Sequence, residues 1–280
     1  MSQEYAEVVK AQSIFKVTNG QFTELQDQVV VEEPLEIQIR FFDKHKWQKK
    51  QLAVTMRTPK RDAELAIGFL FTEGIIGRYT DIESIQLLED NVLIVNLIKE
   101  VKVDLVSVER NFYATSSCGL CGKASIEKLT KIGCFFPQKH LPKISIEMIQ
   151  NLPEALRKTQ SIFEQTGGIH AAGLFEPTGN LLAFAEDVGR HNAVDKLIGH
   201  CLKISVFPLR NHILMLSGRV SFELVQKAMM AGVPIIAAVG APSSLAIELA
   251  EESGITLIGF VREGRLNVYS GIERFMGARS

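Results

Sequence analysis

HILMLSGRVSFELVQKAMMAGVPIIAAVGAPSSLAIELAEESGITLIGF, residues 212–260, carries the clearest secondary-structure pattern of this chain. Its apolar segments 212–216, 234–239 and 255–260 predict buried strands, and the segments 222–231 and 245–253 between them predict helices. Apolar strands separated by single helices are typical of a mainly parallel sheet with helices on its faces. The C-terminal half is therefore expected to be an α/β domain.

On the N-terminal side of this stretch, the predicted strands and helices no longer alternate one by one. Strands are predicted at 169–175 and 181–185, followed by a helix from Asn192 to about His200. Further upstream, strands are predicted at 29–31, 35–41, 51–57, 81–89 and 92–97, with a helix at 63–72 that Asp62 is expected to N-cap. We expect a small α+β domain over residues 1–112 and the α/β domain over residues 113–280.

Composition and charge exclude several classes of protein. The chain has 280 residues and a net charge of −1, so nothing in its overall charge indicates nucleic acid as a partner. It has no apolar run of transmembrane length, and its first residues do not begin a signal peptide. We therefore expect a cytoplasmic protein with no membrane contact, and a homodimer, since twofold pairs are the commonest soluble assembly.

Four loops of the C-terminal half carry glycine, and three of them carry arginine. In such a sheet, ligands bind in the loops beyond the carboxyl ends of the strands. The planar guanidinium group of arginine can donate two parallel hydrogen bonds to a phosphate, and glycine lets the backbone amides come close to it. The chain has neither a Walker A lysine nor a GxGxxG fingerprint. The loops predict a phosphorylated, nucleotide-like ligand, and they are 186–191, 217–219, 240–244 and 261–265.

Two cysteines, Cys118 and Cys121, are spaced as in a metal, redox or sulfur-transfer site. A following helix and Lys123 would favour the reactive thiolate. A structural zinc ion usually needs four ligands, and the chain has no second cysteine pair to complete them, so we expect no metal. A deaminase would need a glutamate after His170, which is absent. Redox cycling and sulfur relay both remain open on the residues alone.

Several blocks of this chain match a known family. They include LAIGFLFTEGII at 65–76, SCGLCGK at 117–123, TGGIHAA at 166–172 and EDVGRHNAVDK at 186–196. Further matches occur at 217–219, 241–246 and 259–262. On these residues the chain resembles the FdhD family, the formate dehydrogenase accessory sulfurtransferases.

The resemblance implies an activity and a fold. Such proteins take sulfur from a cysteine desulfurase and pass it to the molybdenum cofactor, bis-molybdopterin guanine dinucleotide, before the cofactor enters formate dehydrogenase. A guanine nucleotide such as GDP would mimic part of that cofactor. The implied fold is a cytidine deaminase-like, three-layer α/β/α domain without the zinc chemistry. The alternative function is a cofactor-binding chaperone without persulfide chemistry.

The resemblance also assigns residues. Cys118 falls on the persulfide-bearing position, with Cys121 as its catalytic partner, on a loop that Gly119 and Gly122 would make mobile. The stretch 260–265 matches the family's cofactor-contacting segment, although the acidic Glu263 departs from the expected pattern. The cofactor-binding residues expected from this segment and from the loops are Phe260, Val261, Arg262, Glu263, Gly264, Arg265, Arg190, His191, Ser217, Gly218, Arg219, Ala241, Pro242 and Ser243.

Overall fold

The computed structural model describes residues 8–88, 91–104, 136–138 and 140–278. The predicted domain boundary at 112/113 lies outside the described residues. So do Cys118, Cys121 and the helix expected after them.

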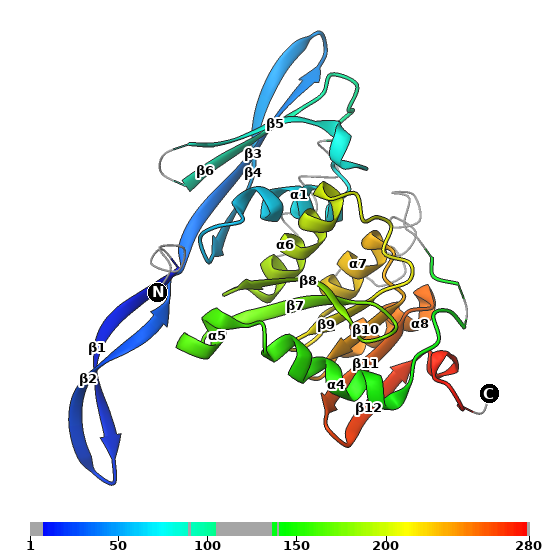
Figure 1. The fold of residues 1–280 in the computed structure, drawn as a ribbon. Helices are drawn as coiled ribbons and strands as arrows, with labels where there is room; N and C mark the ends of the chain where they lie inside the picture. The colour runs from blue at the N-terminus through cyan, green and yellow to red at the C-terminus, as the bar shows by residue number, and fades with distance from the viewer. Residues whose placement is uncertain (1–7, 89–90, 105–135, 139, 279–280) are drawn as a thin grey trace.

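The N-terminal part contains a long hairpin and a four-stranded sheet. The hairpin pairs β1 (Val9–Thr18) with β2 (Gln21–Val30) and extends away from the main sheet (Figure 1). The four-stranded sheet has the order β4-β3-β6-β5, with β3 (Glu33–Asp43) parallel to β6 (Val92–Leu97). The antiparallel partners are β4 (Lys46–Arg57) and β5 (Ile82–Leu88). The strands of the sheet were predicted, whereas most of the hairpin was not.

Helix α1 (Asp62–Thr72) connects this sheet to the rest of the protein by crossing α6 (Arg190–Lys203). The two backbones meet at glycines. A Cβ on Gly68 would lie 1.9 Å from the carbonyl oxygen of Asp195, and one on Gly199 would lie 1.9 Å from that of Glu64. Only glycine permits this approach. The helix pair is part of one continuous hydrophobic core that reaches both sheets.

The N-cap prediction for α1 is wrong. Arg61 occupies the N-cap position, with a left-handed φ of 57° and no side-chain cap, and Asp62 lies in the first turn. The Asp62 carboxylate instead accepts a hydrogen bond from Nε of Arg57 at 2.9 Å. Because Arg57 is only 2 % exposed, a buried guanidinium takes the carboxylate that the sequence pattern assigns to the cap.

The main sheet has six strands in the order β12-β11-β10-β9-β7-β8. Strands β9 (Ile213–Leu216), β10 (Ile235–Ala238) and β11 (Thr256–Arg262) are mutually parallel, as predicted. Strands β7 (His170–Phe175), β8 (Leu181–Asp187) and β12 (Arg265–Ser270) run antiparallel to their neighbours. The expectation of a mainly parallel sheet is therefore wrong, since short hairpin turns at both edges enforce antiparallel pairing.

Helices cover both faces of this sheet (Figure 1). On one face lie α4 (Ile146–Arg157) and α5 (Ser161–Thr166), and on the other α6, α7 (Phe222–Ala231) and α8 (Ser244–Ser253). Alternate residues of β9 enter the two cores: Ile213 and Met215 pack with α4, and Leu214 and Leu216 with the opposite helices. The α/β prediction and its helix-covered sheet are confirmed, while the specific deaminase-like topology stays a prediction.

Two short 3-10 helices, Tyr79–Asp81 and Ile272–Arg274, complete the described elements. Among the described helices, none is both long and apolar enough to cross a membrane.

Candidate functional site

The parallel strands β9, β10 and β11 end at one edge of the sheet, and the loops that follow them are joined there. The amide of Gly240 donates to the carbonyl oxygen of Gly218 at 3.1 Å, and the amide of Phe260 donates to that of Gly240 at 3.2 Å. A Cβ on Gly240 would lie 2.8 Å from the amide nitrogen of Arg219. The structure therefore brings together three of the predicted loop segments, and glycine is required at position 240.

The loop after β10 is fixed to the loop after β9. The amide of Val220 donates to the carbonyl oxygen of Ala241 at 3.1 Å, and the amide of Ser243 donates to that of Val220 at 2.9 Å. Ser243 is also the N-cap of α8, because its hydroxyl accepts from the amide of Ala246 at 3.3 Å. Ser243 therefore has a structural role at the start of this helix. Its hydroxyl has an internal partner, and α8 begins at the edge where the loops meet.

The block 186–196 orders the start of α6. The carboxylate of Asp187 is fully buried, accepts from the amide of Gly189 at 2.8 Å and from Nδ2 of Asn192 at 3.0 Å, and pairs with Nζ of Lys196 at 2.6 Å. Lys196 also donates to the carbonyl oxygen of Thr58 at 2.8 Å. These residues hold the first turn of α6 against the N-terminal part of the chain.

Arg190 and His191 occupy that first turn. The Nε atom of Arg190 is buried and finds no hydrogen-bond partner among the described residues. Nε2 of His191 lies 3.1 Å from the hydroxyl oxygen of Ser221. His170, on β7, connects this turn to the loops, because a Cβ on Gly218 would lie 3.1 Å from its Nδ1. A guanidinium whose buried Nε has no partner among the described residues, next to glycine-bearing loops, is suited to an anion.

A buried lysine, paired with a buried carboxylate, lies close enough to His191 to affect its charge. Lys227 is 6 % exposed and donates to both carboxylate oxygens of Asp195 at 2.9 Å and to Thr72 Oγ1 at 2.9 Å. Burial opposes its charge, but Asp195 and Glu73 together raise the pKa of Lys227 above its ordinary value. Lys227 therefore stays charged at neutral pH.

The surroundings of His191 lower its pKa to about 4, from an ordinary 6.5. Burial is the largest cause, followed by the cations Lys227 and Arg190; Glu223 opposes the shift and His170 adds a little to it. His191 is therefore a neutral imidazole at neutral pH, and an anionic ligand placed beside it would favour its protonation.

This shift predicts a pH dependence of stability. The unfolded chain binds a proton at His191 below about pH 6.5, where the folded protein does not, so this contribution to stability is complete above pH 6.5 and is lost as the pH falls towards 4. We expect His191→Asn to lose free energy of unfolding less steeply over this range than the native protein, as measured by urea unfolding. His45→Asn, at an exposed turn, is the control and should keep the native slope. Equal slopes for His191→Asn and the native protein would contradict the prediction.

The stretch 260–265 divides between buried and exposed positions. Phe260 is half-buried with a left-handed φ of 53°, and the Val261 side chain, 1 % exposed, belongs to the core. Only the backbone of Val261 is therefore available to a ligand. Arg262, Glu263, Gly264 and Arg265 are exposed at the β11–β12 turn, and Cζ of Arg265 lies 5.8 Å from the centroid of the Phe260 ring.

The cysteines predicted to be catalytic, Cys118 and Cys121, lie outside the described residues, as does Cys134. Cys201 is described, is 1 % exposed on α6, and its burial raises the pKa of the thiol to about 11. It is therefore an unreactive core residue. Within the described ranges, no three His, Cys, Asp or Glu side chains gather as a metal site requires.

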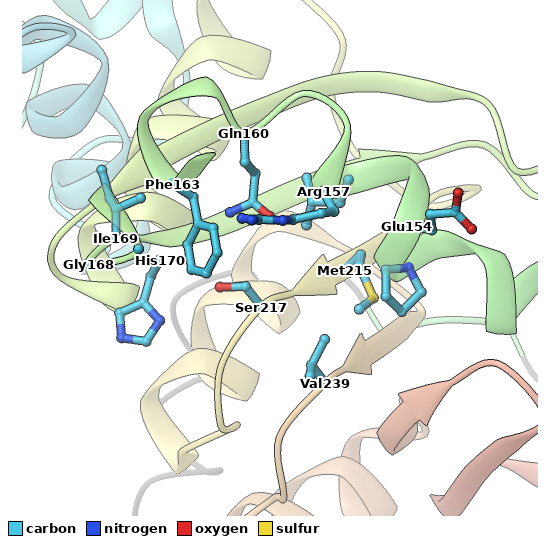
Figure 2. A pocket seen from close by; sticks show the side chains of 13 residues that line it. Glu154, Arg157, Gln160, Phe163, Gly168, Ile169, His170, Met215, Ser217 and Val239 are labelled. Carbon is cyan, nitrogen blue, oxygen red and sulfur yellow. The ribbon is translucent and has the colours of Figure 1, made fainter. Parts of the chain in front are cut away.

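A cavity of about 710 Å³, which no sequence pattern indicated, lies between the α4–α5 segment and the sheet (Figure 2). Of the predicted site residues, only Ser217 lines it; Arg157, Gln160 and Phe163 were not singled out. The sequence does contain a pattern that predicts helix α4: a serine, Ser145, followed by apolar residues at helical spacing, Ile149, Leu152 and Leu156. In the structure the Ser145 hydroxyl accepts from the amide of Met148 at 3.1 Å, and the three apolar residues are buried on one face of the helix.

Comparison with known proteins gives consistent matches. The sequence model described as the FdhD/NarQ family matches residues 30–276. The chain is 47 % identical over 277 residues to a protein of Mycolicibacterium paratuberculosis named "Sulfur carrier protein FdhD", covering 96 % of this chain and 99 % of that one. A protein of the same name from Streptomyces coelicolor is 43 % identical over 278 residues, covering 95 % of each chain.

A solved structure also resembles this chain. It is a crystal structure of a "putative formate dehydrogenase accessory protein" from Desulfotalea psychrophila, with a TM-score of 0.73 and 26 % sequence identity. The match covers 96 % of this chain and 100 % of that one.

Proposed function

Because the chain belongs to the FdhD/NarQ family, we propose that it is a sulfur carrier that serves formate dehydrogenase. It accepts a sulfane sulfur from a cysteine desulfurase on Cys118 and delivers it to bis-molybdopterin guanine dinucleotide, its cargo, before that cofactor enters formate dehydrogenase. The carrier is expected to act in the cytoplasm as a homodimer.

Both steps of this sulfur transfer balance as thiol exchange. The Cys118 thiolate attacks the outer sulfur of the persulfide on the desulfurase, so that a new S–S bond forms on Cys118 and the donor cysteine leaves as a thiolate. Cys121 then attacks the inner sulfur of the Cys118 persulfide. This releases hydrosulfide to the bound cargo and leaves a Cys118–Cys121 disulfide, which a cellular dithiol reduces.

The observation that carries the binding part of the proposal is the convergence of the loops at one sheet edge beside Arg190. The cargo contains diphosphates, and the loops present backbone amides, the start of α8 and a buried guanidinium nitrogen with no partner among the described residues. These groups fit a diphosphate without further assumptions. Arg262 and Arg265 at the exposed β11–β12 turn would add charge at the periphery.

Replacing Arg190 tests directly whether the diphosphate of the cargo binds beside this residue. Hydrogen bonds to charged groups contribute about 1.5–3 kcal/mol, so Arg190→Met is expected to weaken GDP binding roughly 10-fold or more. The measurement is isothermal titration calorimetry of the full chain with GDP. Arg78→Met, which removes an exposed arginine paired with Asp81, is the matched control and should bind GDP as the native protein does. Native affinity in Arg190→Met would contradict the placement of the phosphates.

A further inference from the structure

The four-stranded sheet has two unlike faces. Alternate residues of β3 over 35–41 are buried in the core that the sheet shares with α1. Because side chains alternate along a strand, Arg40 and Phe42 lie on the opposite face. Their partners across the β3–β4 ladder are Lys49 and Trp47, which therefore share that face. The pairing of β3 with β6 ends at Arg40, so the tip of the β3–β4 hairpin extends past β6 (Figure 1).

Two aromatic rings on this face are in contact with cations. The ring centroids of Phe42 and Trp47 lie 5.5 Å apart, edge to face. Cζ of Arg40 lies 4.5 Å from the centroid of Trp47, and Nζ of Lys99 lies 4.6 Å from that of Phe42. Trp47 is nevertheless 39 % exposed. Exposed tryptophan and arginine side chains that pack together are typical of the centre of a protein interface. We call Arg40, Phe42, Trp47, Lys49 and Lys99 the cationic face.

The charges of the cationic face are not balanced within the part of the chain that the structure describes. Arg40, Lys49 and Lys99 are exposed, and none of them forms an ion pair with a described residue. Arg40 and Lys49 lie directly opposite each other on the two strands, where like charges repel. The nearby Asp43 carboxylate accepts from Nε2 of Gln48 at 3.1 Å instead. A partner that brings carboxylates to this face would relieve the repulsion.

We propose that the cationic face docks a carboxylate-rich surface of the protein that donates sulfur. The inference rests on the proposed function, which requires such a donor. The cargo loops belong to the six-stranded sheet, whereas β6, next to Lys99, is the last described strand before Cys118 in the sequence. The docking surface is thus on the sheet that directly precedes the residue to be loaded. Since the net charge of the chain is −1, the positive charge is local and can orient an acidic partner.

Trp47 is the only tryptophan in the sequence, so it is a specific probe of the cationic face. Fluorotryptophan incorporated into the full chain gives a single fluorine resonance in nuclear magnetic resonance. Adding an unlabelled cysteine desulfurase should shift or broaden this resonance, and the effect should weaken as the salt concentration rises. An unchanged resonance at desulfurase concentrations that saturate binding in calorimetry would overturn the proposal. A change caused by formate dehydrogenase or duplex DNA, and not by the desulfurase, would overturn the choice of occupant.

Charge reversal tests the same surface by affinity. Arg40→Glu combined with Lys49→Glu is expected to weaken binding of the desulfurase about 10-fold or more, because like charges would then meet across the interface. The matched control, Lys10→Glu combined with Lys16→Glu, changes the net charge equally at exposed positions of the β1–β2 hairpin and should bind as the native protein does. Equal weakening by both pairs would overturn the proposal, because net charge alone would then explain it.

A further variant and the pattern of outcomes keep the test decisive. Trp47→Ser retains every charge and should also weaken binding, which matters if urea unfolding shows that a charge variant is not folded. If the desulfurase binds the native protein, the charge-reversed variant and Trp47→Ser equally well, the docking surface is wrong and the proposed sulfur transfer stands. If the desulfurase neither binds the native protein nor loads sulfur on Cys118, the docking surface and the proposed function both fall.

Discussion

Asp187→Ala is expected to lower the free energy of unfolding by about 3–5 kcal/mol, the usual cost of removing one partner of a buried ion pair. The change leaves the ammonium group of Lys196, a residue only 1 % exposed, with the carbonyl oxygen of Thr58 at 2.8 Å as its remaining hydrogen-bond acceptor among the described residues. It also removes the acceptor for the Gly189 amide and for Asn192. Domains have total stabilities of about 5–15 kcal/mol, so this is a large fraction.

Chemical denaturation with urea measures this effect. Lys203→Met is the matched control, because it breaks the Lys203–Glu64 pair, in which the lysine side chain is 47 % exposed. The control is expected to change stability by less than about 1 kcal/mol. If Asp187→Ala were as mild as the control, the Asp187–Lys196 pair would not be what holds the start of α6. The fraction of Asp187→Ala protein that remains folded should also bind GDP more weakly. Asp187 holds the first turn of α6, and Arg190 lies in that turn.

Cys118→Ala is expected to abolish activation of formate dehydrogenase while leaving GDP binding at its native strength. The proposed transfer has no other sulfur acceptor at its first step, so the loss should be complete rather than partial. Activity of formate dehydrogenase in cells that carry only the variant measures the first effect, and calorimetry with GDP measures the second. Cys121→Ala should still load sulfur on Cys118 but fail to release it as hydrosulfide.

Cys201→Ala is the control for this experiment. Its thiol is buried on α6 with a pKa raised to about 11, so it has no part in the transfer. Formate dehydrogenase activity should remain at its native level in a folded Cys201→Ala protein. Native activation by Cys118→Ala would instead support the chaperone alternative, in which the cofactor is bound without persulfide chemistry.

The sequence predicted the centre of the fold better than its edges. Strands β9, β10 and β11 are buried on both faces, so they appear as short apolar runs, and helix α7 has the predicted span of 222–231. The direction of an edge strand, parallel or antiparallel, has no comparable pattern in the sequence. Strand β12 returns through a turn at Gly264, whose φ is 70°, and reverses the chain, which the apolar pattern does not show.

The block 186–196 shows how a motif can point to a site without indicating which residues do what. Asp187, Asn192 and Lys196 face inward and anchor the turn, and only Arg190 and His191 are left to meet a ligand. Charge and spacing alone do not distinguish these roles, because the distinction depends on contacts with Thr58, 129 positions from Asp187 in sequence. The cavity with Gln160 was missed for a similar reason, since glutamine has no sequence pattern that marks it as buried.

Mass spectrometry can show whether Cys118 carries a sulfane sulfur, as proposed. The purified protein is incubated with a cysteine desulfurase and cysteine, digested without reductant, and the peptide that contains Cys118 is weighed. We expect a mass gain of one sulfur atom on that peptide, and no such gain on the Cys201 peptide or in the Cys118→Ala protein. A Cys118 peptide that gains no sulfur under conditions where the desulfurase is active would contradict it.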